Sequence, residues 1–377
     1  MRGKLPGDLL VRSTIAPRRL VDSGAHSGAH SGALSFALLL LSLSLSGCIS
    51  GASLHYVTQA AAGQEKLNGR GIDIQEVIDN GYLDKRTRGL LTAVPSIKAF
   101  GERHGLRPTK NYERYLWIGR PAVMWVVSAC DPLRFRQKTW SFPVIGSITY
   151  TGWFDRKEAD DYAKELAAKG WDVDVRGSQA YSTLGWFNDP ILSTMLGGGD
   201  DALGDLADVV LHESLHATFY VPGQSTLNES MASFVGDTLA AEYLAEAKGA
   251  ESTDKNRFIE LRKKSEARGK RMKEAYAELE SLYASKVPKD EKLAEKKRIT
   301  DTLRAELRIQ RPVTNATLIQ YKTYGSGRDE MEKLLEVCGG SVPRMIKALE
   351  KIRPLAKGAR PHTDPALLLR PLLDQGC

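Results

Sequence analysis

The chain has 377 residues, of which 42% are hydrophobic and 26% are charged, and its formal net charge is +7. This length and composition allow a substantial buried core in one large domain or two coupled domains. Without the five basic and two acidic residues of segment 1–47, the net charge falls to +4, which is too little to argue for nucleic-acid binding.

The N-terminal segment predicts export rather than a folded element. Residues 34–47 form an apolar run that is too short for a comfortable transmembrane helix but suits the core of a signal peptide. The run ends in Leu-Ser-Gly before Cys48, which looks like a bacterial lipobox. We therefore expect residues 1–47 to be a lipoprotein signal peptide and Cys48 to carry the lipid. A plain signal peptide or an interfacial helix is the alternative.

The expected location follows from the lipobox. A lipid on Cys48 would anchor the mature protein in the bacterial cell envelope. Ile49 and Ser50 follow this cysteine, and the absence of Asp favours the outer membrane, facing the periplasm, by analogy with lipoprotein sorting.

The first part of the mature chain predicts helices followed by a small sheet. Apolar residues recur at helical spacing in three segments, Tyr56 to Leu67, Ile74 to Asn80 and Asp84 to His104. Tyr115 to Ala129 is rich in strand-forming residues, and a further strand ends at residues 150–154. Asp155 and Glu158 form a capping box for a helix that Gly170 closes, and Trp171 to Val175 follows as a strand.

The string His-Glu-Ser-Leu-His at residues 212–216 indicates a metal site. On a helix, His212 and His216 lie one turn apart on one face, so both imidazoles can reach a single Zn²⁺. Glu213 lies beside them as a possible base. A chance match, with a solvated or core histidine pair, is the alternative interpretation, and the residues that follow argue against it.

Those residues predict two packed helices. Apolar residues recur at helical spacing through 203–219, and Val221-Pro222-Gly223 ends that helix. A second helix is expected to start at Ser225 or Thr226 and to carry Glu229 in its first turn. Small residues on the neighbouring face would let it approach the first helix closely enough for Glu229 to complete the metal site; they are Ala232, Ser233 and Gly236.

Two resemblances support this interpretation. The Asn-Glu-x-x-Ala element at 228–232 resembles the third-ligand motif of gluzincins, which are zinc peptidases with two His ligands and one Glu ligand. Most of the mature chain is similar to a bacterial family of aminopeptidase lipoproteins. The hallmarks of that family stand at residues 140–147 (WSFPVIGS), 150–154 (YTGWF) and 180–190 (AYSTLGWFNDP), and in the two metal helices. The resemblance implies a peptide substrate and a zincin-like core.

The chain departs from these families in several places. The larger gluzincin aminopeptidases have a longer connector and a Gly-Ala-Met-Glu-Asn-type segment, and neither is found here. Ser141 and Ser147 stand where the lipoprotein family has cysteines, Thr151 stands where it has Arg, and the motif reads HESLH rather than HELAH. Loss of the cysteine pair would remove a possible disulfide but leaves every inferred zinc ligand in place.

Three protein ligands leave a position for a water molecule whose pKa the metal lowers towards neutrality. Glu213 would take the proton and deliver it to the leaving amine. Because a Tyr stabilises the oxyanion in gluzincins, Tyr321 and Tyr324 are candidates for that role, although a structural role is the more common one for such residues. Asp208 and Asp237 are candidates to orient the imidazole rings of the two histidines.

The remaining chain predicts a helical hairpin and a C-terminal region. Residues 48–245 are expected to form the catalytic region, with N-terminal helices and a sheet. Residues 246–311 predict two charged antiparallel helices that project as a hairpin and join at Val287-Pro288. Residues 312–377 are expected to pack on the core as helices and to end in an irregular tail from Leu355. The expected fold is therefore a mostly helical α+β protein.

Three cysteines remain besides Cys48, namely Cys130, Cys338 and Cys377. They permit at most one internal disulfide, and the sequence does not say which. Ser178 to Phe187 is placed where an edge strand could bind substrate by strand addition, although its aromatic residues could instead be core.

The leading hypothesis is a zinc metallopeptidase, in particular an aminopeptidase. An endopeptidase or amidase that acts on envelope polymer is one alternative. A non-catalytic scaffold lipoprotein with structural zinc is the other, although structural sites usually close with four Cys or His ligands.

Overall fold

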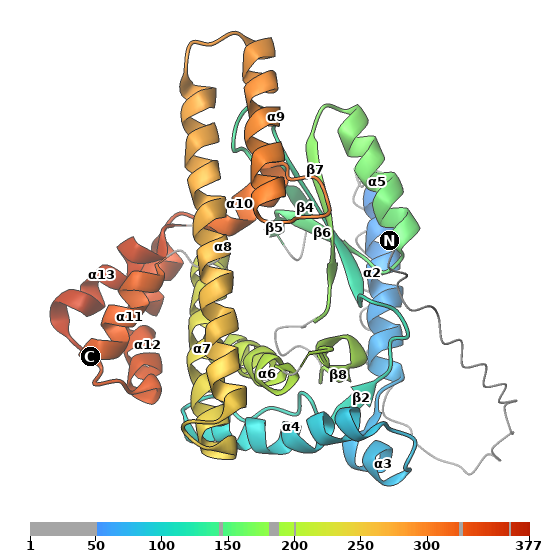
Figure 1. Ribbon diagram of the computed structural model, residues 1–377, viewed down its shortest axis with the longest axis vertical. Helices are drawn as coiled ribbons and strands as arrows, with labels where there is room; N and C mark the ends of the chain where they lie inside the picture. The colour runs from blue at the N-terminus through green and yellow to red at the C-terminus, as the bar shows by residue number, and fades with distance from the viewer. Residues whose placement is uncertain (1–50, 143–145, 181–187, 200, 324–326, 362) are drawn as a thin grey trace, which may run out of the picture. The chain divides into compact units, whose positions relative to one another are not determined.

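The computed structural model describes residues 51–142, 146–180, 188–199, 201–323, 327–361 and 363–377. Residues 55–377 form one unit by their contacts. The described part has twelve α-helices, two three-stranded sheets and one two-stranded sheet (Figure 1). The prediction of a mostly helical α+β protein is therefore confirmed. The proposed signal segment, Cys48 and Tyr324 lie outside the described residues.

Three helices begin the described chain, close to their predicted bounds: α2 (Gly51–Gly69), α3 (Ile74–Asp79) and α4 (Lys85–Arg103). Aspartates cap the second and third. Asp73 accepts hydrogen bonds from the backbone N–H groups of Gln75 and Glu76, and Asp84 accepts one from Thr87. No helix in the described ranges is long and apolar enough to cross a membrane.

The first sheet has the order β1-β2-β8, formed by β1 (Ile72–Asp73), β2 (Arg114–Leu116) and β8 (Ile191–Leu192). Strand β2 pairs antiparallel with β1 and parallel with β8, so this sheet is mixed. The second sheet has the order β6-β3-β7 and is antiparallel, formed by β6 (Tyr150–Trp153), β3 (Met124–Cys130) and β7 (Asp172–Ser178). A separate hairpin pairs β4 (Trp140–Phe142) with β5 (Gly146–Ile148).

The predicted strand Tyr115 to Ala129 is wrong as one element, because β2 and β3 belong to different sheets. Gly119 interrupts it with φ +67, a left-handed conformation that glycine adopts without steric cost. Pro121 follows and cannot donate a ladder hydrogen bond. The chain therefore turns between the two strands.

The β6-β3-β7 sheet is covered on both faces. On one face, Trp125, Val127 and Val175 pack with residues of α5 (Arg156–Ala168). Asp155 caps that helix by accepting from the Glu158 N–H, as predicted. On the other face lies α10 (Asn315–Thr323), which contacts both β3 and β7.

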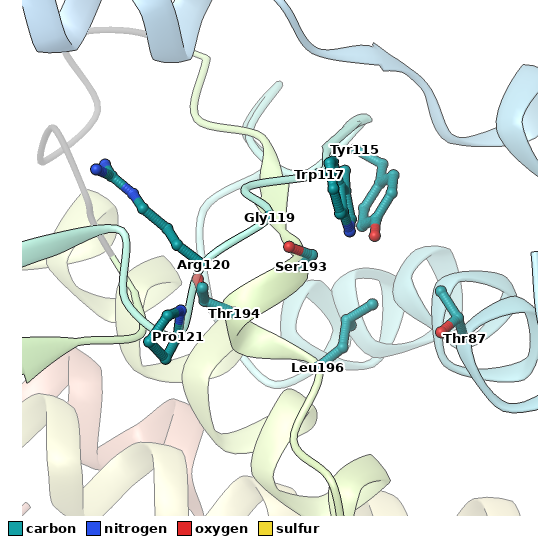
Figure 2. A pocket seen from close by; sticks show the side chains of 9 residues that line it. All are labelled: Thr87, Tyr115, Trp117, Gly119, Arg120, Pro121, Ser193, Thr194 and Leu196. Atoms are coloured by element: carbon teal, nitrogen blue, oxygen red, sulfur yellow. The ribbon is translucent and has the colours of Figure 1, made fainter. Parts of the chain in front are cut away.

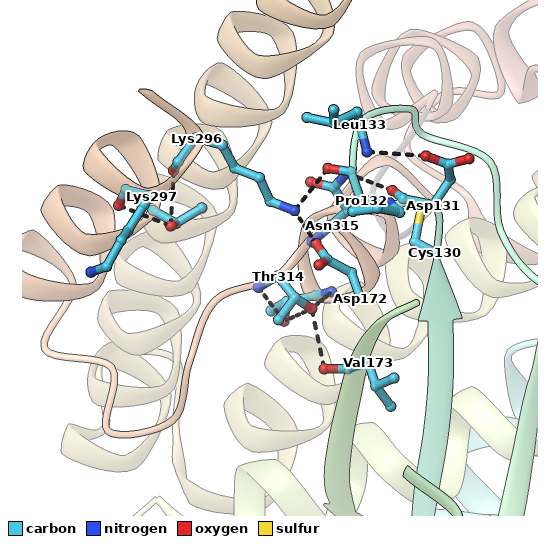
Figure 3. Close-up of polar contacts among 12 residues, drawn as sticks. Cys130, Asp131, Pro132, Leu133, Asp172, Val173, Lys296, Lys297, Thr314 and Asn315 are labelled. Atoms are coloured by element: carbon cyan, nitrogen blue, oxygen red, sulfur yellow. Dashed lines mark hydrogen bonds and ion pairs between the residues drawn. The ribbon is translucent and has the colours of Figure 1, made fainter. Parts of the chain in front are cut away.

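The predicted charged hairpin is the helix pair α8 (Thr253–Ala284) and α9 (Lys289–Glu306), which lie side by side in Figure 1. Figure 3 shows how α9 is tied to the sheet. The Lys296 ammonium donates to the Asp172 carboxylate and to the Pro132 carbonyl. Asp172 also accepts from the backbone N–H of Asn315, at 3.0 Å. One partly buried carboxylate thus joins β7, α9 and α10.

The C-terminal region is more regular than predicted. It forms α11 (Arg328–Val337), α12 (Val342–Gly358) and α13 (Pro365–Gln375), so the prediction of an irregular tail from Leu355 is wrong. Pro365 lies at the first position of α13, where its missing N–H costs nothing, and Asp364 caps the helix. A disulfide joins Cys338 to Cys377, and Cys130 is free and buried.

The main core contains the metal-motif helices α6 (Ala202–Thr218) and α7 (Ser225–Lys248), preceded by a short 3-10 turn, η1 (Ser193–Met195). Gly236 of α7 lies close against α6. A methyl group there would lie 3.1 Å from the Asp208 carbonyl oxygen and 3.2 Å from the His212 Cβ. The predicted need for a small residue is confirmed at this position.

We expect Gly236→Val to lower the free energy of unfolding by roughly 1–3 kcal/mol, because the new side chain must separate α6 from α7. Gly269→Val in α8 is the matched control, since nothing lies within 4 Å of a Cβ at Gly269 and the change of helix propensity is the same. Denaturant unfolding of both variants measures the difference. Equal stability of the two variants would show that the Gly236 contact does not constrain the fold.

Candidate metal centre

The helix α6 carries His212 and Glu213 next to each other, and His216 one turn later. The centroids of the two imidazole rings are 4.9 Å apart, and the ring planes are at 84° to each other, so the two rings do not occupy the same space. Leu211 and Leu215, on the opposite side, are fully buried and fix the rotation of the helix. The predicted metal helix and its histidine spacing are therefore confirmed.

Asn228 controls the turn that brings α7 back to α6. Its side-chain oxygen accepts a hydrogen bond from the Val221 N–H, and its amide nitrogen donates to the Val221 carbonyl, both at 2.9 Å. Gln224, in the same turn, donates to the carbonyl of Ala356, in the last turn of α12, and to that of Arg360, just after the helix. These bonds place Glu229, the next residue after Asn228, opposite the histidines.

Glu229 faces both histidines. Its two carboxylate oxygens lie 3.7 Å from the Nε2 atom of His212 and 3.6 Å from that of His216. One ligand atom from each residue lies within 4.8 Å of the others. Ligands of a tetrahedral zinc ion, each about 2.1 Å from the metal, lie roughly 3.4 Å from one another. The three side chains, which we call the triad, therefore fit a single metal ion.

The electrostatics of the triad favour a cation. Burial alone would lower the pKa of His212, but contact with Glu229 and the charges of Glu213 and Asp208 raise it to about 9. His216 has a side chain that is only 3% exposed, and burial together with the charge of His212 lowers its pKa to about 4. Burial would raise the pKa of Glu229, but the two histidines and Arg176 lower it, so this carboxylate is ionised.

The predicted supporting acids contact arginines behind the triad. Asp208 accepts from the Arg262 guanidinium at 3.2 Å, and Asp237 lies 3.5 Å from Arg262 and accepts from Arg328 at 3.2 Å. Burial and the charge of Asp237 raise the pKa of Asp208 to about 7. Asp208 also acts on His212 through its charge. The Nδ1 atom of His216, by contrast, is buried with no hydrogen-bond partner in the described part of the chain.

A tyrosine that the sequence did not single out lies near Glu213. Tyr112 is 2% exposed, and its hydroxyl has no hydrogen-bond partner among the described residues. Its φ of 66° is unusual for a bulky residue, and its N–H donates to the Asp189 carbonyl at 2.7 Å. Burial and the charges of Glu213 and Asp189 raise the pKa of this hydroxyl well above its ordinary value. Tyr112 therefore remains a donor beside the predicted base.

The predicted oxyanion residues are only partly described. Tyr321 lies on α10, packs against the cluster formed with α8 and α9, and interacts with the charge of Arg311. Tyr324 lies outside the described residues. Tyr220 contacts the triad directly, with its ring centroid 6.3 Å from that of His216. The sequence contains a signal for this contact, because Tyr220 follows His216 by four residues.

A pocket of about 420 Å³ lies elsewhere in the fold (Figure 2). Its polar groups are already engaged. Arg120 donates to the carbonyls of Val123 and Phe154, Ser193 accepts from the Ile118 N–H, and Thr194 donates to Gln179. None of the residues that line it belongs to the triad. This pocket is therefore separate from the candidate metal ligands.

We expect the purified protein from residue 49 onward to bind one metal ion per chain, and His212→Ala, His216→Ala and Glu229→Ala each to lose it, because two ligands hold a metal far more weakly than three. His55→Ala is the control, since the His55 side chain is 58% exposed and its one described ion-pair contact is with Glu158. Elemental analysis after dialysis measures the bound metal. Full metal content in Glu229→Ala would remove Glu229 from the ligand set.

Comparison with known proteins agrees with this geometry. Residues 55–363 match the family described as "Putative aminopeptidase". No curated protein and no solved structure matches the chain, so the zincin-like character of the core stays a prediction. The family match covers most of the chain and includes all three residues of the triad. The protein therefore belongs to this aminopeptidase family.

Proposed function

We propose that the protein is a zinc-dependent peptidase and, within that class, an aminopeptidase. The observation that carries this proposal is the triad of His212, His216 and Glu229 beside Glu213. Two imidazoles and one carboxylate form a donor set that suits zinc. A set of three protein ligands is typical of catalytic rather than structural zinc sites.

When bound, zinc would supply Lewis-acid activation of water and of the substrate carbonyl. Glu213 takes a proton from the attacking water and delivers it to the nitrogen of the leaving amine. Tyr321 and Tyr324 are the proposed donors to the oxyanion, and Tyr220 joins them because its ring contacts His216. Tyr112 keeps its hydroxyl proton because its pKa is raised, so it can act as a hydrogen-bond donor near Glu213.

We place the substrate along β7. This strand is last in the order β6-β3-β7, so one of its edges has no partner strand among the described residues. Thr314 approaches that strand at the Val173 carbonyl, which leaves the end near Ser178 for an extended peptide. The predicted substrate segment Ser178 to Phe187 starts there, and its residues 181–187 lie outside the described part.

Two other functions compete with this proposal. An endopeptidase or amidase of the cell envelope would use the same triad but would lack an acidic anchor for a free amine. A scaffold lipoprotein would use zinc structurally, and the three-residue ligand set argues against it.

We also propose that the protein is lipid-anchored in the cell envelope through Cys48, on the strength of the lipobox sequence alone. We expect Cys48→Ser to leave the precursor uncleaved and unlabelled by radioactive palmitate, because the thiol is the lipid acceptor. Expression in a bacterial host followed by fractionation measures both properties. A wild-type protein found soluble in the periplasm would contradict the anchor.

Glu213→Gln separates an enzyme from a scaffold. The amide preserves the size of the side chain and does not touch the metal, so zinc content and folding should equal those of the wild type. Loss of the base should lower kcat by roughly a hundredfold or more. The assay compares peptides that carry a free amino terminus with the same peptides acetylated.

The outcomes distinguish the three functions. Cleavage of the free peptides only, abolished by Glu213→Gln, supports an aminopeptidase. Cleavage of both series indicates an endopeptidase. Zinc-loaded wild type and variant that are equally inert across a broad peptide library would indicate a scaffold.

A further inference from the structure

Two of the three triad residues lie close to the ends of their helices. His216 is in the last turn of α6, and Glu229 follows directly after the first turn of α7. Helix ends fray more readily than helix interiors. Residues 219–224 join the two ends, and we call them the connector. The spacing between His216 and Glu229 therefore depends on how firmly the connector is held.

The helix α12 holds the first part of the connector through Arg353. The central carbon of the Arg353 guanidinium lies 4.4 Å from the centroid of the Phe219 ring. Its Nη1 donates to the Tyr220 carbonyl at 2.8 Å. Phe219 is the residue that ends α6, and its N–H donates to the Leu215 carbonyl at 2.7 Å. Tyr220 is the residue whose ring contacts His216. One side chain of α12 thus contacts both residues that follow the last turn of α6.

The Arg353 guanidinium is itself oriented by Glu350, three residues earlier on α12. The Nε and Nη2 atoms of Arg353 donate to the two Glu350 carboxylate oxygens, each at 2.6 Å. Such a bidentate pair fixes the plane of the guanidinium. It leaves Nη1 for the Tyr220 carbonyl. The Arg353 side chain is 27% exposed and lies between its carboxylate partner and the connector, so it has little freedom to leave either.

The same helix also holds the other end of the connector. Gln224 is 1% exposed, and its amide nitrogen donates to the carbonyls of Ala356 at 3.0 Å and Arg360 at 2.9 Å. Its side-chain oxygen accepts from the Thr363 N–H at 3.1 Å. The Gln224 carbonyl accepts from the Asn228 N–H in the first turn of α7. Both ends of the connector are therefore bound to α12 and to the residues just after it.

We propose that Arg353 is a positioning residue for the metal centre. By holding the connector at Phe219 and Tyr220, it prevents the last turn of α6 from opening. His216 then keeps the spacing from Glu229 that one metal ion requires. The proposal rests on the zinc site proposed above. Residues that orient metal ligands without touching the metal typically change metal affinity by about tenfold to a hundredfold when they are lost.

The experiment uses the protein from residue 49 onward as wild type, Arg353→Met and Arg353→Lys. Methionine still packs against the Phe219 ring but has no donor for the Tyr220 carbonyl, whereas lysine keeps the charge and one donor group. Arg298→Met is the matched control. Arg298 of α9 forms the same kind of pair with a glutamate three residues earlier, Glu295, and its described hydrogen bonds are all to that carboxylate.

We expect Arg353→Met to raise the Kd for Zn²⁺ roughly tenfold to a hundredfold, because His216 is no longer held at its spacing from Glu229. Arg353→Lys should recover part of the loss. Competition with a chromophoric chelator measures the Kd. The visible absorption spectrum of the Co²⁺-loaded protein reports the arrangement of the ligands, and it should change in Arg353→Met. Arg298→Met should match the wild type in both measurements.

Hydrogen exchange of the metal-free protein gives a second measurement that does not depend on a bound ion. Backbone amides of residues 212–229 should exchange faster in Arg353→Met than in the wild type or Arg298→Met, while α4 and the β6-β3-β7 sheet keep their protection. If the wild type binds neither Zn²⁺ nor Co²⁺, the zinc proposal fails, and faster exchange confined to residues 212–229 still supports the hold of Arg353 on the connector. Wild-type Zn²⁺ affinity in Arg353→Met, or exchange that is unchanged in residues 212–229 or faster throughout the chain, would overturn the Arg353 proposal.

Discussion

The close approach of α6 and α7 at Gly236 is the constraint on which the metal centre depends. Because Gly236 has no side chain, the backbone of α7 can lie against Asp208 and His212 on α6. Asn228 fixes the turn between the helices by binding both backbone groups of Val221. With the turn and the helix contact both fixed, Glu229 has little freedom other than to face the two histidines at 3.6–3.7 Å. The ligand geometry is thus set by packing rather than by the metal alone.

The close approach of α6 and α7 brings carboxylates of the two helices together, and their mutual repulsion has to be offset by positive charge. Asp208 and Asp237 come from the two helices and repel each other, which contributes to the raised pKa of Asp208. Arg262 of α8 and Arg328 of α11 lie against them and offset that repulsion. Through Arg262, the charged hairpin is in this way an electrostatic support for the metal helices. A partly buried charge cluster of this kind is sensitive to loss of one member.

The sequence predicted best what depends on local spacing. The helix bounds, the cap at Asp155 and the histidine pair all follow from residues within one or two turns. It predicted poorly what depends on residues far apart in the chain. The sequence does not specify which cysteines pair, and it does not reveal that the tail forms a helix whose leucines are buried against the core. Tyr112 comes from a loop with no motif, and only the fold brings its hydroxyl within reach of the charge of Glu213.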